Sequence, residues 1–210
     1  MTITPASSKR RDKQINKYDR IVDAAYQLFL AQGFEQVSIQ EIATHAGVAK
    51  GTFYLYFRDK EQLRECVISQ KSNEIFRRAL NALHQTDIQD FEGQIIFVVD
   101  YVTDVLAQNR EALKLIAKDL SFGLFNQKVS QYFTEDQTDI LQVLLSAAAK
   151  NRIRLKNPQI LLYMIIELVS STCFSCILDA KPLEIAVFKP YLFDAVRALI
   201  QSQRIDYSQG

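Results

Sequence analysis

The sequence predicts an all-α protein. Apolar residues recur at helical spacing over most of the 210-residue chain, no segment shows the alternation of a half-buried strand, and only four residues are proline. The hydrophobic share of 48% is sufficient for a packed core, and the length suits one or two domains. We expect an arm over residues 1–17, a small domain over residues 18–64 and a larger helical domain over residues 65–207.

The arm is basic and contains few apolar residues. Its sequence, MTITPASSKRRDKQINK, has a cluster of cations at Lys9, Arg10, Arg11 and Lys13. A segment of this composition cannot bury enough apolar surface to order itself, so we expect it to be flexible. Two interpretations stay open: an arm that contacts the minor groove or the phosphates of a nucleic acid, or a disordered tail that keeps the protein in solution.

A short helix is expected to begin after Ser38. Glu41 stands three residues later, and this spacing is typical of a capping box, in which the hydroxyl and the carboxylate bind free amides at the helix start. The apolar residues of this helix recur on one face, at Ile39, Ile42, Ala43 and Ala46. Gly47 is expected to end the helix, because glycine readily adopts the left-handed conformation found at helix termini.

A second helix is expected to begin near Ala49. Phe53 and Phe57 share one face and should pack inward, whereas Gly51 and Leu55 project outward. The outward face is surrounded by side chains that can reach phosphate oxygens: Lys50, Tyr54, Tyr56, Arg58 and Lys60. Because a glycine on a nearly uncharged face lets a helix backbone approach a groove closely, the pattern predicts a DNA-binding helix-turn-helix.

Residues 38–63, SIQEIATHAGVAKGTFYLYFRDKEQL, closely resemble the amino-terminal domain of the tetracycline-repressor-like (TetR) family of bacterial regulators. The resemblance covers roughly residues 18–64 and includes the pair Gly33 and Phe34. It implies that one set of residues faces double-stranded DNA: Ser38, Lys50, Gly51, Thr52, Tyr54, Tyr56 and Lys60. Leu55 departs from the family pattern, in which a polar residue is frequent, and its side chain either touches a thymine methyl group or makes no contact.

A competing interpretation treats these aromatic and basic residues as the core and the solvated surface of an ordinary helical domain. The capping box, the glycine turn and the basic flank would then coincide by chance in one window. The net charge of the chain is only +1, but residues 1–64 hold ten basic and seven acidic side chains, and the remainder holds fifteen and seventeen. The positive excess lies with the motif, so we expect salt-sensitive DNA binding.

The rest of the chain shows further helical patterns. Asp59 and Gln62 are expected to cap a helix that runs to about Leu83. Apolar-periodic segments then follow at residues 91–108, 110–122, 126–150, 158–178 and 182–204. Pro190 lies in the last of these segments, where it either kinks the helix or marks the first turn of a new one.

Residues 160–178 are long and apolar enough to raise the question of a membrane span. Because Glu167 is central, the second half is polar and no basic belt flanks the segment, we expect a helix buried against protein and no membrane partner. The TetR resemblance implies that this segment and residues 191–200 form a four-helix interface of a homodimer, which would bind a palindromic operator. The expected interface residues are Ile165, Leu168, Val169, Val196, Leu199 and Ile200.

The same resemblance places a small-molecule pocket among the middle helices. Aromatic residues there supply enough surface for an apolar or aromatic effector, although at helical spacing such residues also suit an ordinary core. The candidate lining residues are Phe76, Leu80, Phe97, Tyr101, Phe122, Phe125, Tyr132, Phe133 and Phe174. Asp100, Asp104 and Glu167 provide counter-charges for a cationic ligand, or else Asp100 and Asp104 belong to the wet edge of their helix.

No arrangement typical of an active site is visible in the sequence. Cys173 and Cys176 form a C-x-x-C pair on an apolar segment, and Cys66 is the third cysteine. With no matching histidine pair, we expect buried small hydrophobic side chains and no metal site. Since no nucleophile, carboxylate pair or phosphate loop stands out, we expect neither an enzyme nor a cofactor. The chain has no apolar signal-peptide core, which favours the cytoplasm.

These patterns together suggest a ligand-responsive transcriptional regulator. Most members of the family that it resembles are repressors, in which a free dimer binds its operator and an effector in the carboxy-terminal domain releases it. Two alternatives remain open. In the first, the chain is an all-α binding or enzyme module that keeps the helix-turn-helix only as packing. In the second, it is a TetR-like activator without an effector.

Overall fold

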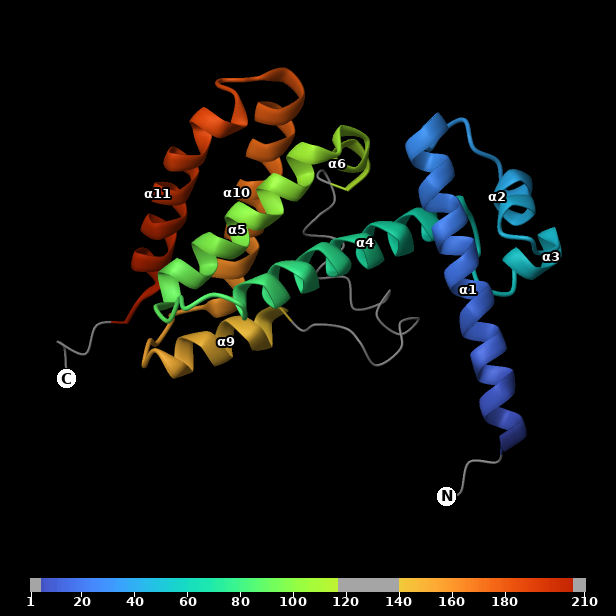
Figure 1. Ribbon diagram of the computed structural model, residues 1–210, viewed down its shortest axis with the longest axis horizontal. Coiled ribbons are helices and arrows are strands. Elements are labelled where there is room, and N and C mark those ends of the chain that lie inside the picture. Colours follow the sequence, from blue (N-terminus) through green and yellow to red (C-terminus); the bar gives the residue numbers. More distant parts are fainter. Residues whose placement is uncertain (1–4, 117–139, 206–210) are drawn as a thin grey trace. The chain divides into compact units, whose positions relative to one another are not determined.

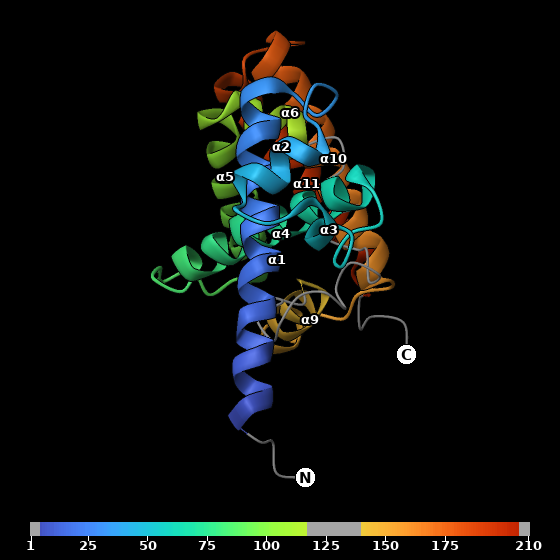
Figure 2. The same cartoon turned by 90° about the vertical axis from the view of Figure 1, so that its right-hand side faces the viewer.

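Figures 1 and 2 show a computed structural model of the protein, which describes residues 5–116 and 140–205. These residues form helices joined by loops and contain no β-strand, only an isolated bridge between Leu155 and Arg204. The prediction of an all-α protein is therefore confirmed. The chain divides into two compact units, Met1–Ile68 and Ser69–Gly210.

The first unit consists of α1 (Pro5–Gln32), α2 (Ile39–His45), α3 (Lys50–Phe53) and the first turns of α4 (Lys60–Leu83), which continues into the second unit. Helix α2 packs against both α1 and α3 (Figure 1). The core of this unit is made of buried apolar side chains from these helices and from the turn after α3: Ile21, Val22, Ala25, Phe29, Ile42, Ala43, Phe53, Phe57, Leu63 and Val67.

Helix α1 begins at Pro5, so residues 5–17, which their composition led us to expect as a flexible arm, are helical. Proline is common at the first position of a helix, since an amide there would have no partner within the helix. The lysine, arginine and glutamine residues that follow have high helix propensities. Extending an existing helix is also favourable, because each added residue forms one more backbone hydrogen bond. Composition alone did not separate a polar helix from a disordered arm.

The predicted capping box at the start of α2 is confirmed. The hydroxyl of Ser38 accepts a hydrogen bond from the amide of Glu41 at 3.2 Å, and the Glu41 carboxylate accepts one from the amide of Ser38 at 2.8 Å. Hydrogen bonding of the Glu41 carboxylate to the side chain and to the backbone amide of Ser38 lowers the pKa of Glu41. The helix therefore begins at Ile39, where the sequence placed it.

Gly47 ends the α2 segment in the predicted left-handed conformation, with φ at +62°. After this turn, the amide of Val48 donates to the carbonyl of Ala43 at 2.9 Å. Arg20 of α1 donates to the carbonyl of Gly47 at 3.2 Å, and a Cβ atom on Gly47 would lie 2.4 Å from that guanidinium. Both the backbone conformation and the neighbouring arginine therefore favour glycine here.

The second unit contains the rest of α4 together with α5 (Phe91–Gln108), α6 (Arg110–Ile116), α9 (Ile140–Lys150), α10 (Pro158–Asp179) and α11 (Ile185–Gln203). Helix α10 packs against α5, α6, α9 and α11, and α11 also packs against α5 (Figure 1). The predicted helical segments are thereby confirmed over the described residues.

Helix α10 is the most apolar of the helices described in this unit. By length and composition alone, α10 could cross a membrane. In this structure 44% of its most apolar stretch is buried, and the helix packs against α5, α6, α9 and α11. Asn157 caps its start by accepting a hydrogen bond from the amide of Ile160 at 3.0 Å. Pro190 lies in the second turn of α11, so α11 begins before this proline, at Ile185.

An ion-pair cluster joins α11 to α5. The ammonium of Lys189 lies 2.5 Å from a carboxylate oxygen of Asp100 and 2.6 Å from one of Asp104. Burial opposes the charge on Lys189, but the hydrogen bonds to the two carboxylates outweigh it and raise the pKa of the lysine. Asp100 and Asp104 are thus paired within the protein, which removes the interpretation that they serve as counter-charges for a cationic ligand.

Candidate DNA-contacting surface and apolar cavity

Six of the eight residues predicted to face DNA lie on α3 and on the turn that follows it, whereas Ser38 caps α2 and Lys60 begins α4. Lys50 and Gly51 are exposed at the start of α3, and Tyr54 and Leu55 are exposed just after its end. Leu55 exposes 79% of its surface, the largest fraction among the exposed large apolar residues of the described chain. Thr52 is half-buried between them. The outward face is therefore short, mostly uncharged and accessible.

Aromatic packing holds this surface from behind. Phe53 and Phe57 are buried, and their rings lie 5.6 Å apart, which confirms the predicted inward face. Tyr18 of α1 packs against Phe57 at 5.2 Å and against Tyr56 at 6.2 Å. Partial burial raises the pKa of Tyr56, so its phenol remains a neutral hydrogen-bonding group at physiological pH. The exposed residues thus extend from a well-packed support.

Helix α3 is shorter than the sequence suggested, with four residues. The chain continues as a turn in which the amide of Leu55 donates to the carbonyl of Thr52 at 3.2 Å and that of Tyr56 donates to Phe53 at 3.0 Å. These three-residue spacings continue the helical path in a tighter form. Tyr54 and Leu55 consequently remain beside α3 on the outward side.

Lys60 makes contacts inside the protein that the sequence did not indicate. Its ammonium donates hydrogen bonds to the carbonyls of Phe34, Glu35 and Val37, at 2.8, 3.3 and 3.0 Å, and lies 4.4 Å from the centre of the Phe34 ring. An ammonium group has only three N–H donors. In this structure Lys60 therefore ties the loop between α1 and α2 to the start of α4 and has no donor left for a phosphate.

Other cations remain available around the surface. The ammonium of Lys50 has no hydrogen bond or ion pair with another residue of the described ranges, and Lys50 is exposed. Arg58 is also exposed, although its guanidinium pairs with Asp59 at 2.6 Å. Ser38 is exposed as well, with its hydroxyl engaged in the helix cap. Of the three residues, Lys50 is thus the one whose side chain has no partner among the described residues.

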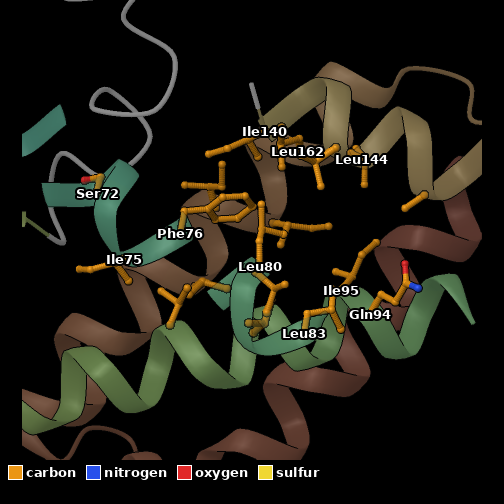
Figure 3. A pocket seen from close by; sticks show the side chains of 18 residues that line it. Ser72, Ile75, Phe76, Leu80, Leu83, Gln94, Ile95, Ile140, Leu144 and Leu162 are labelled. Atoms are coloured by element: carbon orange, nitrogen blue, oxygen red, sulfur yellow. The ribbon is translucent and has the colours of Figure 1, made fainter. Parts of the chain in front are cut away.

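The second unit contains an apolar cavity of about 110 Å³ between α4, α5, α9 and α10 (Figure 3). Its lining consists of side chains from four helices: Ser72, Ile75, Phe76, Leu80 and Leu83 on α4, Gln94, Ile95, Val98, Val99 and Val102 on α5, Ile140, Val143, Leu144 and Ala147 on α9, and Leu162, Ile165, Ile166 and Val169 on α10. Among these described residues none is charged, and Phe76 is the one aromatic side chain.

The cavity includes two of the residues predicted to line an effector pocket. Phe76 and Leu80 line it, as expected, but Phe97, Tyr101 and Phe174 do not. Phe97 and Tyr101 pack against each other at 6.5 Å on the face of α5 that turns away from the cavity-lining residues. The other four predicted lining residues, Phe122, Phe125, Tyr132 and Phe133, lie outside the described residues.

Most of the lining was missed because it is aliphatic. The only sequence signal was the apolar stripe on each helix, such as Ile95, Val98, Val99 and Val102 on α5. Such a stripe faces the interior whether the interior is filled or hollow. The cavity therefore depends on how four helices fit together, which no single segment reveals.

Most of the residues predicted for a dimer interface are buried inside the single chain, and the interface itself stays a prediction. Ile165, Val169, Val196 and Ile200 are buried within the single chain, and the first two line the cavity. Leu168 and Leu199 are half-buried. Helix α10 has apolar residues on every side, so its sequence did not indicate which side packs inside the unit. The large apolar residues that are exposed on α10 and α11 are different ones: Ile160, Tyr163, Val187 and Tyr191.

The three cysteines are buried thiols. Burial raises the pKa of both Cys66 and Cys173 to about 11 and also raises that of Cys176. Such thiols are almost entirely protonated at neutral pH and are poor nucleophiles. No group of three or more histidine, cysteine or acidic side chains suited to a metal occurs within the described ranges.

Comparisons with known proteins agree with the fold and with the motif. Residues 21–67 match the family model described as "Bacterial regulatory proteins, tetR family". The fatty acid metabolism regulator protein of Bacillus subtilis (strain 168) is 39% identical over 62 residues, which are 30% of this chain and about a third (32%) of that protein. An HTH-type transcriptional regulator of Staphylococcus aureus (strain USA300) is 26% identical over 188 residues, or 88% of this chain and 94% of that protein.

Solved structures share the fold over most of the chain at low sequence identity. The transcriptional regulator FadR from Bacillus subtilis, in complex with stearoyl-CoA, is 19% identical with a TM-score of 0.57, and the match covers 85% of this chain and 97% of that chain. RolR in complex with resorcinol is 16% identical with a TM-score of 0.63, covering 91% and 94%. The helix-turn-helix geometry and the family match over residues 21–67 show that the chain contains the amino-terminal domain of tetR-family bacterial regulatory proteins, and the solved structures show a shared fold.

Proposed function

We propose that this chain is a repressor that binds a palindromic DNA operator as a homodimer and leaves it when an apolar effector occupies the cavity. The observation that carries the proposal is the outward surface of α3 and its following turn, where Lys50, Tyr54 and Leu55 are exposed above a buried aromatic layer. A soluble helix would ordinarily expose charged residues at such positions. An accessible leucine and a glycine suit close contact with a base-pair edge.

The contacts that we propose divide into two kinds. Lys50, Tyr54 and Tyr56 would bind phosphates, which position the protein without reading the sequence. Leu55 and Thr52 would contact base edges, where an apolar side chain favours the methyl group of thymine. The backbone around Gly51 would lie closest to the groove.

Exposed apolar residues on α10 and α11 support a homodimer. Ile160 and Tyr163 on α10 each expose half of their surface, and Val187 and Tyr191 on α11 expose 56% and 64%. A helix that is apolar on all sides normally has every side covered by protein. A second copy would cover these residues by placing its own α10 and α11 against them, and it would supply the second reading surface for a palindromic operator.

The effector is supported by the cavity in the second unit. Its lining is almost wholly apolar, which favours a ligand that gains by leaving water. Proteins of the same fold have been solved with stearoyl-CoA and with resorcinol. An effector would release DNA only to the extent that it binds the DNA-free form more tightly than the DNA-bound form.

The proposal can be tested by selecting bound sequences from random duplex DNA with the purified full chain. We expect enrichment of an inverted repeat, whose half-sites lie about one helical turn, or roughly 34–36 Å, apart. Recovery of unrelated sequences without a shared motif would contradict sequence-specific binding. Recovery of a single unrepeated site would instead contradict the homodimer.

A substitution at Gly51 separates DNA contact from folding. Gly51→Ala is expected to weaken operator binding by at least about tenfold, because a methyl group would hold the backbone away from the groove. The same substitution should not lower the thermal midpoint, since a Cβ atom at Gly51 meets no other atom within 4 Å. Titration with the selected duplex and a thermal melt of the free protein test both parts. A variant that loses stability together with binding would mean that Gly51 is required for folding.

A further inference from the structure

One polar group of the cavity lacks a partner. Ser72 on α4 is only 1% exposed and lines the cavity, and its hydroxyl has no hydrogen-bond partner among the described residues (Figure 3). A serine inside a helix commonly donates to the carbonyl four residues earlier, which would satisfy it locally. Because that bond is missing, the Ser72 hydroxyl keeps its capacity to donate and accept a hydrogen bond; its oxygen is fully buried in this conformation, so a ligand reaches it once the side chain rotates toward the cavity.

The other polar lining residue is already engaged. The side-chain amide of Gln94 donates to the carbonyl of Ile88 at 3.0 Å and to that of Gln89 at 3.4 Å, both in the segment before α5. Figure 3 shows Ser72 and Gln94 at opposite ends of the labelled side chains. Among the described lining residues, Ser72 is therefore the one polar residue at its end of the cavity.

The remaining lining restricts the ligand further. The other sixteen lining residues are apolar, and none of the described lining residues carries a charge. A carboxylate or ammonium group would lose its hydration there without gaining a counter-charge, which is strongly unfavourable. A trapped water molecule needs two to four polar partners, which the Ser72 hydroxyl alone does not supply. The cavity is therefore suited to hydrocarbon with one polar group at the Ser72 end.

We propose that the effector is an uncharged, mainly aliphatic molecule with one hydroxyl or carbonyl group, which forms a hydrogen bond with the hydroxyl of Ser72. This inference rests on the proposed function, because it names the class of ligand for the same cavity. It also replaces the expectation of an aromatic-lined pocket, since Phe76 is the one aromatic residue in the described lining.

Three six-carbon probes test the proposal by calorimetric titration of the DNA-free full chain: 1-hexanol, hexane and hexanoate at pH 7. We expect 1-hexanol to bind the wild-type protein and hexanoate to show no measurable binding. Ser72→Ala should lower the affinity for 1-hexanol roughly three- to tenfold, the usual range for one hydrogen bond, and leave the affinity for hexane unchanged. Ser72→Cys keeps a weak hydrogen-bond donor, so its affinity for 1-hexanol should lie between those of the wild type and of Ser72→Ala.

Ser69→Ala is the matched control. Ser69 is equally buried, also at 1%, and lies one turn earlier on α4, but it does not line the cavity. Its replacement should leave 1-hexanol binding unchanged. Ser72→Ala should also keep the thermal midpoint of the ligand-free protein, because it removes a hydroxyl with no described partner. A loss of stability in Ser72→Ala would show that this hydroxyl has a structural bond.

Equal affinities of wild type and Ser72→Ala for 1-hexanol would overturn the proposal, as would tight binding of hexanoate. These results do not depend on DNA, so they are separable from a failure of the proposed function. If 1-hexanol binds through Ser72 but does not weaken the protein–operator complex, the ligand site stands and its role as an effector site fails.

Discussion

Lys60→Ala is expected to lower the free energy of unfolding of the amino-terminal unit by about 2–4 kcal/mol. The substitution removes three charge-assisted hydrogen bonds, to the carbonyls of Phe34, Glu35 and Val37, together with the contact between the ammonium and the Phe34 ring. The loop between α1 and α2 would then lose its link to α4. Amide hydrogen exchange should show faster exchange in residues 33–38 and in the neighbouring helices.

Lys50→Ala provides the matched control, because it removes the same side chain from an exposed position. The ammonium of Lys50 has no hydrogen bond with another described residue, so its loss should leave hydrogen exchange and the thermal midpoint unchanged while DNA binding weakens. If Lys60→Ala behaved in the same way as Lys50→Ala, with a stable fold and weaker DNA binding only, Lys60 would be a phosphate contact, as the sequence suggested.

Tyr191→Arg is expected to separate the dimer into monomers and to weaken operator binding by about 10²–10⁴-fold, since a monomer loses the benefit of two linked reading surfaces. Tyr191 exposes 64% of its surface in the single chain, so an arginine fits the monomer without strain. In the proposed interface, however, it would place an unpaired cation against an apolar surface. Sedimentation velocity of the free protein and titration with the selected duplex measure the two effects.

Ala186→Arg introduces the same side chain on the same helix. Ala186 lies five residues before Tyr191, so at about 100° per residue the two side chains point to different sides of α11. Ala186 is also exposed, and its replacement should leave the dimer intact. A Tyr191→Arg protein that still sediments as a dimer would place the interface elsewhere. Leu199, which the sequence suggested for this test, is half-buried, so a charge there would also disturb the fold of the single chain.

The parts of the fold that could be predicted are those in which neighbouring residues satisfy one another. Ser38 and Glu41 cap α2 through two hydrogen bonds across three residues, and Gly47 takes a backbone conformation that glycine favours whatever surrounds it. Phe53 and Phe57 share one side of a single helical turn, so their burial followed from their spacing.

The parts that could not be predicted depend on distant partners. Lys60 binds backbone carbonyls 23 to 26 residues earlier. Because every residue has a backbone carbonyl, the sequence does not indicate which of them a lysine will bind. On α10, Ile160 and Ile165 are chemically equivalent, yet the first is half-exposed and the second lines the cavity. The free hydroxyl of Ser72 likewise depends on the absence of a local bond that most helical serines make.

The most direct test of the account is the affinity of the full chain for its selected duplex and for a scrambled duplex, measured at several salt concentrations. We expect the selected duplex to bind at least about a thousandfold more tightly at physiological salt. We also expect Lys50→Ala to weaken both affinities and to reduce the salt slope by about one. Equal affinity for the two duplexes, or no salt dependence, would contradict the proposal that α3 reads DNA.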